Sequence, residues 1–315
     1  MRIQENYLGD VVAKYYTQIV DQCFSDDGKY VISINSFGHI ITCPCPSNDS
    51  AANSASNTGN THTNLQLTSG KSLANVLICG DANGNVHGFN SSSLIESATA
   101  NTNGSISLHD IEVLKKPISV FGGHSQKINK LAKRSEFEFV SCSDDGLVQF
   151  WDSRLNKKPP RTLQVASHSQ VSRPNCANEI YAVDVDDDFV VCGGGVNLSM
   201  WHLSSSSLAL VLNNGEDGDQ TEICSAVEMV DGQILAGATT FTNNATLHRY
   251  NYSGSSILSL KINMNSIRNI HTAEFSTQTH KTSVVSGESS QLFFLTDFGF
   301  ISSSIKQQKS VDEIV

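Results

Sequence analysis

The sequence predicts an all-β fold of the β-propeller class, and three observations carry this prediction. One unit recurs along the chain: a short apolar strand, a tight turn rich in Asp, Gly and Asn, and an alternating strand with an aromatic or apolar end. Successive copies are mostly separated by about 45 to 50 residues, the length of a four-stranded propeller blade. No segment between the copies has the 3.6-residue period of an amphipathic helix.

Six copies of the unit are recognisable, and we expect a ring of seven blades or a six-bladed variant. The best is FVSCSDDGLVQFWD at residues 139–152, where a turn of two Asp and a Gly separates the strands and the second strand ends at Trp151. FVVCGGGVNLSMWHL at residues 189–203 repeats the pattern with a glycine turn and ends at Trp201. Weaker copies occupy residues 29–43, 76–90, 234–251 and 283–297.

Two polar stretches interrupt this pattern, at about residues 47–72 and between residues 90 and 107. They hold too few apolar residues to offset the entropy of ordering the chain, so we expect disordered or extended surface loops there. We therefore expect one propeller domain over residues 1–315 with a low-complexity insert at about 47–72. The apolar spacing of residues 4–15 predicts a short helix that caps the first blade.

Composition and charge narrow the class of function. The 21 Lys and Arg against 31 Asp and Glu give a net charge of −10, which opposes direct binding to nucleic-acid phosphates.

The apolar runs are strand-sized, and the N-terminal residues lack the apolar core of a secretory signal. We therefore expect no membrane association and a location in the cytosol or nucleus. The 8 cysteines form no CxxC pair and are read as small buried residues.

Three residues of the best copy, together with a histidine upstream of it, resemble the internal hydrogen-bond tetrad of WD40 repeats. His124 follows Gly123, and Asp145 and Trp151 lie in the turn and the strand downstream; Ser141 supplies the hydroxyl, with Ser143 as the alternative. In that tetrad a carboxylate fixes the histidine, which joins a strand hydroxyl and the tryptophan N–H. The fold class is therefore a WD40-type β-propeller, and this set is favoured as structural over a Ser-His-Asp catalytic triad.

Other chemical motifs fail on their spacing, so we expect no catalytic, metal or cofactor site and no enzyme activity. Residues 70–72 read Gly-Lys-Ser but lack the upstream glycine of a phosphate-binding loop. The glycines 193–195 lead into a strand, whereas dinucleotide binding needs a helix there. The aspartates within residues 184–188 lack the spacing of a calcium loop and are read as a solvated turn.

Beyond the generic repeat, the chain resembles the THO complex subunit 6 family. The resemblance is carried by GGHSQKINKLA (122–132), SCSDDGLVQFWDSR (141–154), SHSQVSRP (167–174), VVCGGGVNLSMWHLSSS (190–206) and LFFLTDFGFISSSI (292–305). It implies seven blades, so either one blade is degenerate, with the polar insert after Cys45 as its expected place, or the ring closes differently. We expect residues 300–305 to pair near residues 17–24 and seal the ring.

The same resemblance implies a non-catalytic scaffold subunit of a THO/TREX-like complex, which couples transcription to mRNA processing and export in the nucleus. Its implied partners are other THO subunits, especially the coiled-coil subunits 5 and 7, with mRNA contacted indirectly through the complex. No cofactor is implied.

A second class of function has its own motif. Trp151-Asp152-Ser153-Arg154 fits the WDxR pattern of proteins that look like substrate receptors of cullin-4 ubiquitin ligases, which dock on a cullin-4 adaptor through exposed Asp152 and Arg154. The basic cluster at residues 157–161 is read as a solvated loop, with an import signal or a contact to an acidic partner as alternatives.

Overall fold

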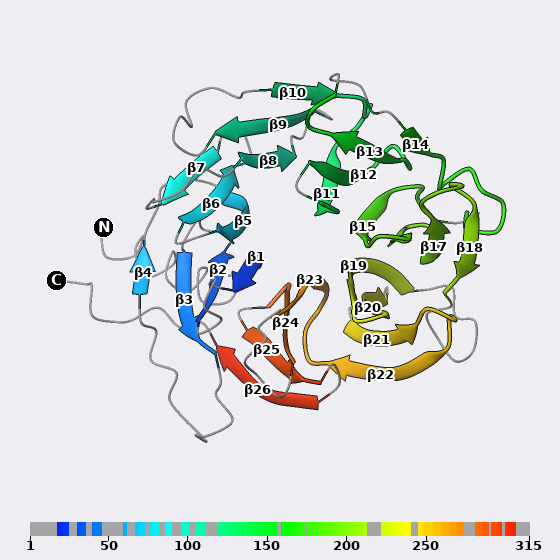
Figure 1. Cartoon of the computed structure of the whole chain (residues 1–315). Coiled ribbons are helices and arrows are strands. Elements are labelled where there is room, and N and C mark those ends of the chain that lie inside the picture. Colours follow the sequence, from blue (N-terminus) through cyan, green and yellow to red (C-terminus); the bar gives the residue numbers. More distant parts are fainter. Residues whose placement is uncertain are drawn as a thin grey trace, which may run out of the picture. The chain divides into compact units, whose positions relative to one another are not determined.

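A computed structural model of the 315-residue chain shows strands throughout the described residues (Figure 1). The structure describes residues 18–24, 30–35, 40–45, 59–61, 67–73, 76–81, 86–89, 96–100, 105–110, 119–135, 137–155, 159, 161–173, 176–212, 222–240, 245–273, 281–289, 291–297 and 300–306. The helix expected at residues 4–15 lies outside these ranges. Within them, no helix is long and apolar enough to cross a membrane.

The described strands form seven antiparallel sheets, and the chain divides into two compact units. The sheets are β1 (Ile19–Phe24), β2 (Tyr30–Asn35), β3 (Ile40–Pro44), β4 (Gly59–Thr61); β5 (Leu67–Leu73), β6 (Val76–Asp81), β7 (Val86–Phe89); β8 (Glu96–Ala100), β9 (Ser105–Asp110), β10 (Ser119–Gly122); β11 (Ile128–Lys133), β12 (Glu138–Ser143), β13 (Val148–Asp152), β14 (Arg161–Leu163); β15 (Ile180–Val185), β16 (Phe189–Gly194), β17 (Ser199–His202), β18 (Leu208–Val211); β19 (Glu222–Val230), β20 (Gln233–Thr240), β21 (Ala245–Asn251), β22 (Ser256–Ile262); and β23 (Ile267–Thr272), β24 (Thr282–Gly287), β25 (Gln291–Thr296), β26 (Phe300–Lys306). One unit comprises Met1–Asp81, His87–Ser93 and His271–Val315, and the other Ala82–Val86 and Leu94–Ile270.

Each sheet pairs strands that follow one another in the chain, which is the strand order of a propeller blade. All six sequence units coincide with a hairpin of neighbouring strands; residues 139–152, for example, form β12 and β13, with Phe139 opposite Trp151. The predicted fold class, an all-β propeller of the WD40 type, is therefore confirmed.

The sheet that the repeat search missed consists of β8, β9 and β10. Part of it lies between residues 90 and 107, and β4 and most of β5 lie within the 47–72 insert; the expectation of loops was wrong for these strands. The blade without a recognisable repeat was expected in the insert after Cys45, and this position was wrong, because the sheet is formed by β8, β9 and β10. Strands pair through backbone hydrogen bonds, which Ser and Thr provide as well as Val does, so a strand need not show apolar alternation. In β9 the buried Ile106 anchors the strand.

Among the strands that the structure describes, the expected closing pair is not formed. β26 pairs with β25, and β1 pairs with β2, so the two terminal strands belong to different sheets. β1 instead meets β24, where the side chain of Gln22 donates from Nε2 to the carbonyl oxygen of Val284 at 2.7 Å.

In the second unit, apolar clusters lie between neighbouring sheets. One cluster joins the β11–β14 and β15–β18 sheets, and it includes Cys142, Val183 and Trp201, each at most 3% exposed. Close packing also explains the glycine run at the end of β16, residues 193–195. A Cβ atom at Gly195 would overlap the carbonyl oxygen of Ala177, so glycine is required there by the neighbouring backbone.

Candidate functional site

The four residues of the expected tetrad lie together in the β11–β14 sheet. Trp151 Nε1 donates to Ser141 Oγ at 2.8 Å, and the serine hydroxyl lies 2.7 Å from His124 Nε2. On the other side of the ring, His124 Nδ1 lies 2.9 Å from Asp145 Oδ2. If Nδ1–H donates to Asp145 and the serine donates to Nε2, one arrangement of protons satisfies every group.

Asp145 is held by more than the histidine. Its carboxylate also accepts hydrogen bonds from the backbone N–H of Ser125 at 2.9 Å and of Leu147 at 3.1 Å. Burial alone would raise the pKa of Asp145, but these hydrogen bonds and that from His124 outweigh it and hold the pKa below its ordinary value. The carboxylate therefore stays charged and ties the loop before β11 to the turn before β13.

The next sheet carries a partial copy of this network, which the sequence analysis did not identify. Trp201 Nε1 donates to Ser199 Oγ at 2.9 Å, and the ring of His168 packs edge-on against Trp201 with centroids 5.2 Å apart. Cys192 opposes Ser199, as Ser141 opposes Gln149 in the first sheet. The buried Nδ1 of His168 has no hydrogen-bond partner among the described residues. His168 follows a serine, so a search for Gly-His overlooks it.

A third histidine network was also missed. His248 on β21 is buried; its Nδ1 lies 2.9 Å from Ser259 Oγ on β22, and its Nε2 lies 2.9 Å from Glu222 Oε2 on β19. The backbone carbonyl of Glu222 accepts a hydrogen bond from Arg173 Nη1 at 2.7 Å. The set contains the residue types of a Ser-His-Glu triad, but it ties three strands of one sheet together, which is the same kind of role that the tetrad performs.

Two aspartates of the 184–188 run accept hydrogen bonds from residues of the neighbouring sheet. The carboxylate of Asp184 accepts a hydrogen bond from the backbone N–H of Met229 at 2.6 Å, and Asp186 accepts one from Tyr252. Burial raises the pKa of Asp184 to about 7 despite that hydrogen bond. Within the described residues, no group of three His, Cys, Asp or Glu side chains is placed to hold a metal ion.

The WDxR residues lie where β13 ends. Arg154 donates to Asp152 from Nε at 2.9 Å and from Nη2 at 2.7 Å, and these bonds lower the pKa of Asp152 to about 2. The Arg154 side chain is 58% exposed, whereas that of Asp152 is only 11% exposed. The expectation of an exposed aspartate was wrong, because the carboxylate is turned inward to close the turn.

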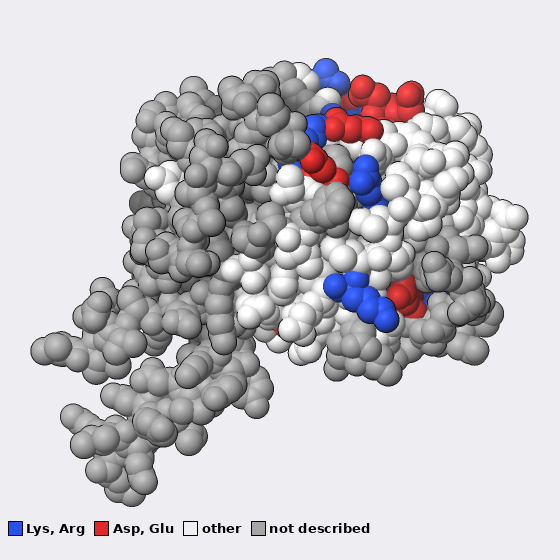
Figure 2. Space-filling view, turned by 90° about the horizontal axis from the view of Figure 1, so that it is seen from below, with Lys and Arg blue, Asp and Glu red and all other residues white. Residues whose placement is uncertain are grey.

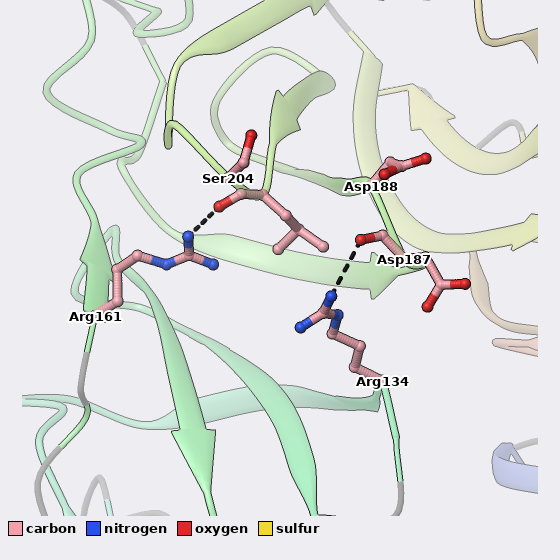
Figure 3. A pocket seen from close by; sticks show the side chains of 6 residues that line it. Arg134, Arg161, Asp187, Asp188 and Ser204 are labelled. Carbon is pink, nitrogen blue, oxygen red and sulfur yellow. Dashed lines mark hydrogen bonds between the residues drawn. The ribbon is translucent and has the colours of Figure 1, made fainter.

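Close to this turn, the β11–β14 and β15–β18 sheets enclose a notch of about 270 Å³ (Figure 3). Its lining residues are Arg134, Arg161, Asp187, Asp188, Leu203 and Ser204. Arg161 is the last residue of the basic cluster at residues 157–161, of which residues 157, 158 and 160 lie outside the described residues. Nothing in the sequence pattern indicated that Arg134 would lie near Arg161, since Arg134 follows β11 and Arg161 begins β14.

Comparison with known proteins shows what this chain is similar to. The family model for the WD40 repeat, described as WD domain, G-beta repeat, matches residues 115–152, which contain the tetrad. The THO complex subunit 6 homolog of Danio rerio is 30% identical over 189 residues, 58% of this chain and 53% of that protein. THO complex subunit 6 of Drosophila melanogaster is 25% identical over 211 residues, 66% of this chain and 54% of that protein.

The matches thus span about half the length of these curated relatives. Among solved structures, the computationally designed Ika8 protein covers 94% of this chain with a TM-score of 0.62 and 16% identity, a likeness of fold alone. The repeat match and the two relatives agree with the resemblance carried by the sequence motifs. The resemblance to the THO complex subunit 6 family is thus confirmed, and the chain contains a repeat of the WD40 type.

Proposed function

We propose that the protein is a non-catalytic scaffold subunit of a THO/TREX-like complex that couples transcription to mRNA processing and export in the nucleus. The observation that carries the proposal is the 30% identity to a THO complex subunit 6 homolog over 58% of the chain. On this proposal, the partners are other THO subunits, especially subunits 5 and 7. The tetrad around His124 then serves to hold the β11–β14 sheet rather than to perform chemistry.

The charge of the chain supports an indirect contact with mRNA. Its net charge is −10, and on the face seen in Figure 2 the basic side chains of described residues stand among acidic ones without forming a continuous basic area. A protein that binds the phosphate backbone by itself needs such an area. In this proposal, the partner subunits supply the RNA contacts.

Affinity purification of the tagged protein from nuclear extract, followed by mass spectrometry, tests this function. We expect the other THO subunits to be recovered, and to the same extent after nuclease treatment. Loss of these subunits on nuclease treatment would show that RNA alone links them to the protein. Their absence from both samples would refute the proposed membership.

A second candidate function is that of a substrate receptor for a cullin-4 ligase. The exposed guanidinium of Arg154 at the end of β13 favours it, since an adaptor could reach this group. In the Arg154→Ala variant, loss of the cullin-4 adaptor from the purified material with intact THO recovery would support this reading. If the adaptor is absent from the wild-type material, the candidate is excluded.

A further inference from the structure

Two arginines of the β11–β14 sheet border the notch that this sheet forms with the β15–β18 sheet. Arg134 follows the end of β11 and Arg161 begins β14. Figure 3 shows their guanidinium groups pointing toward the same space, with Ser204 at its edge. The carboxylates of Asp187 and Asp188 point away from both guanidinium groups in the same view. The two arginines therefore supply the donors of a notch whose lining also includes these aspartates.

The two positive charges are unequally compensated. Arg134 forms an ion pair with Glu138 at 2.8 Å and donates to the backbone carbonyl of Asp187 at 3.1 Å. Arg161 lies over the ring of Phe150 at 3.9 Å and donates to the carbonyl of Leu203, but it forms no ion pair with any residue that the structure describes. Burial, and then the charge of Arg134, lower the pKa of Arg161. The charge of Glu138 acts in the opposite direction, but that carboxylate is paired with Arg134, so no described carboxylate is bound to Arg161 itself.

The neighbouring surface is that of a protein interface rather than of a site for a small anion. Phe137, three residues after Arg134, is 36% exposed, and Leu155 in the following loop is 57% exposed. Arg154 lies 4.7 Å above the Phe137 ring, and the backbone N–H of Ser153 donates to the Phe137 carbonyl at 2.9 Å, so these two turns are adjacent. Exposed aromatic and aliphatic side chains mixed with arginines are typical of protein interfaces.

We propose that this notch receives an acidic side chain of a partner protein, whose carboxylate is bound by Arg161 and Arg134. A carboxylate matches the fork of a guanidinium group, and both arginines keep N–H groups that no described residue accepts. Phe137 and Leu155 would pack against apolar residues that flank the acidic one. The inference rests on the proposed function as a docking subunit, and it names the chemistry that one of its contact sites recognises.

Fluorescence anisotropy with the purified full chain tests this inference. The probe is a fluorescein-labelled peptide of repeated Glu-Gly-Leu, and its matched control replaces each Glu by Gln. We expect saturable binding of the acidic peptide at low salt, weaker binding as the ionic strength rises, and none of the control peptide. Arg161→Gln should weaken binding at least about tenfold, since hydrogen bonds between charged groups are worth about 1.5–3 kcal/mol.

Two variants separate a specific site from a general charge effect. Arg268→Gln removes the same charge from an exposed position on β23, outside the notch, and should bind as the wild type does. Arg161→Lys keeps the charge but loses the fork, and should bind with intermediate affinity. A melting temperature close to that of the wild type shows that each variant is folded.

Equal binding by Arg161→Gln and wild type, equal losses in Arg161→Gln and Arg268→Gln, or no saturable binding of the acidic peptide would overturn the proposal. If Arg161→Gln does not fold, Arg134→Gln, which changes a more exposed side of the notch, takes its place with the same expected loss. Because the assay contains only this chain and a peptide, its result is independent of whether THO subunits co-purify.

Discussion

Replacement of Ser141 by alanine tests the hydrogen-bond network of the β11–β14 sheet more sharply than removal of Trp151. The serine side chain is fully buried, and its hydroxyl meets both Trp151 Nε1 and His124 Nε2. Alanine keeps the backbone and nearly the whole volume, so the substitution leaves little cavity. What it removes is the one oxygen on which two buried polar groups depend.

The magnitude follows from the number of groups left without a partner. A buried polar group that loses its partner costs about 1–3 kcal/mol, so Ser141→Ala, with two such groups, should cost about 2–6 kcal/mol. Ser199→Ala is the matched control, because its hydroxyl is also fully buried but accepts from Trp201 Nε1 without a histidine bound to it. That substitution should cost about 1–3 kcal/mol.

The assay is thermal unfolding followed by circular dichroism or calorimetry. Unfolding entropies of about 2.1 cal/mol/K per residue imply, for 315 residues, a shift of about 1.5 °C per kcal/mol. The melting temperature should therefore fall about twice as far in Ser141→Ala as in Ser199→Ala. Equal falls in the two variants, or an unchanged melting temperature in Ser141→Ala, would refute the assigned network.

Three further predictions concern other buried groups. The pKa of Asp145 is lower in the folded state, so its contribution to stability is present at neutral pH and is lost on acidification below about pH 4; stability curves of Asp145→Asn should lack that acid-side loss. The pKa of Asp184 is raised to about 7, beside Glu228, so the folded state holds the extra proton and stability falls as the pH rises from about 4 to about 7; Asp184→Asn should remove this slope and unfold at higher denaturant than the wild type at pH 8. Gly195→Ala forces a side chain into backbone and should cost at least about 2 kcal/mol more in urea unfolding than Gly232→Ala, which has open space and costs about 1 kcal/mol for its positive φ. A smaller cost for Gly195→Ala than for Gly232→Ala would contradict the packing argument.

The sequence predicts most of the fold because the middle strands of a blade are buried and therefore carry a strong pattern. Residues 139–152 and 189–203 alternate apolar side chains around Asp- or Gly-rich turns, and both form hairpins inside their sheets. The strands β8 and β9 escaped this search because their composition is polar, although their backbone pairing is as regular as elsewhere. Pattern recognition depends on which side chains are buried, whereas strand pairing depends on the backbone.

The WDxR motif and the His168 network show a different limit of prediction from sequence. The WDxR motif is visible in the sequence, but whether its aspartate faces solvent depends on the turn, and in the folded chain Arg154 holds Asp152 inward. The partial network of His168 and Trp201 was missed because the histidine follows Ser167 instead of a glycine. A local motif gives residue types, but not their exposure.

By itself, the sequence determined the fold class, the resemblance to the THO complex subunit 6 family and the residue types of the first tetrad, since each of these is encoded by residue types at short and regular spacings. Only the tertiary structure decided that Arg134 and Arg161 share a notch with Asp187 and Asp188, because these residues come from two sheets and no spacing links them. The physical reason is that a blade is specified by the alternation of apolar and polar side chains along each strand and by the residue types of its turns. A surface between blades depends on how two sheets pack, and every side chain between them contributes to that packing.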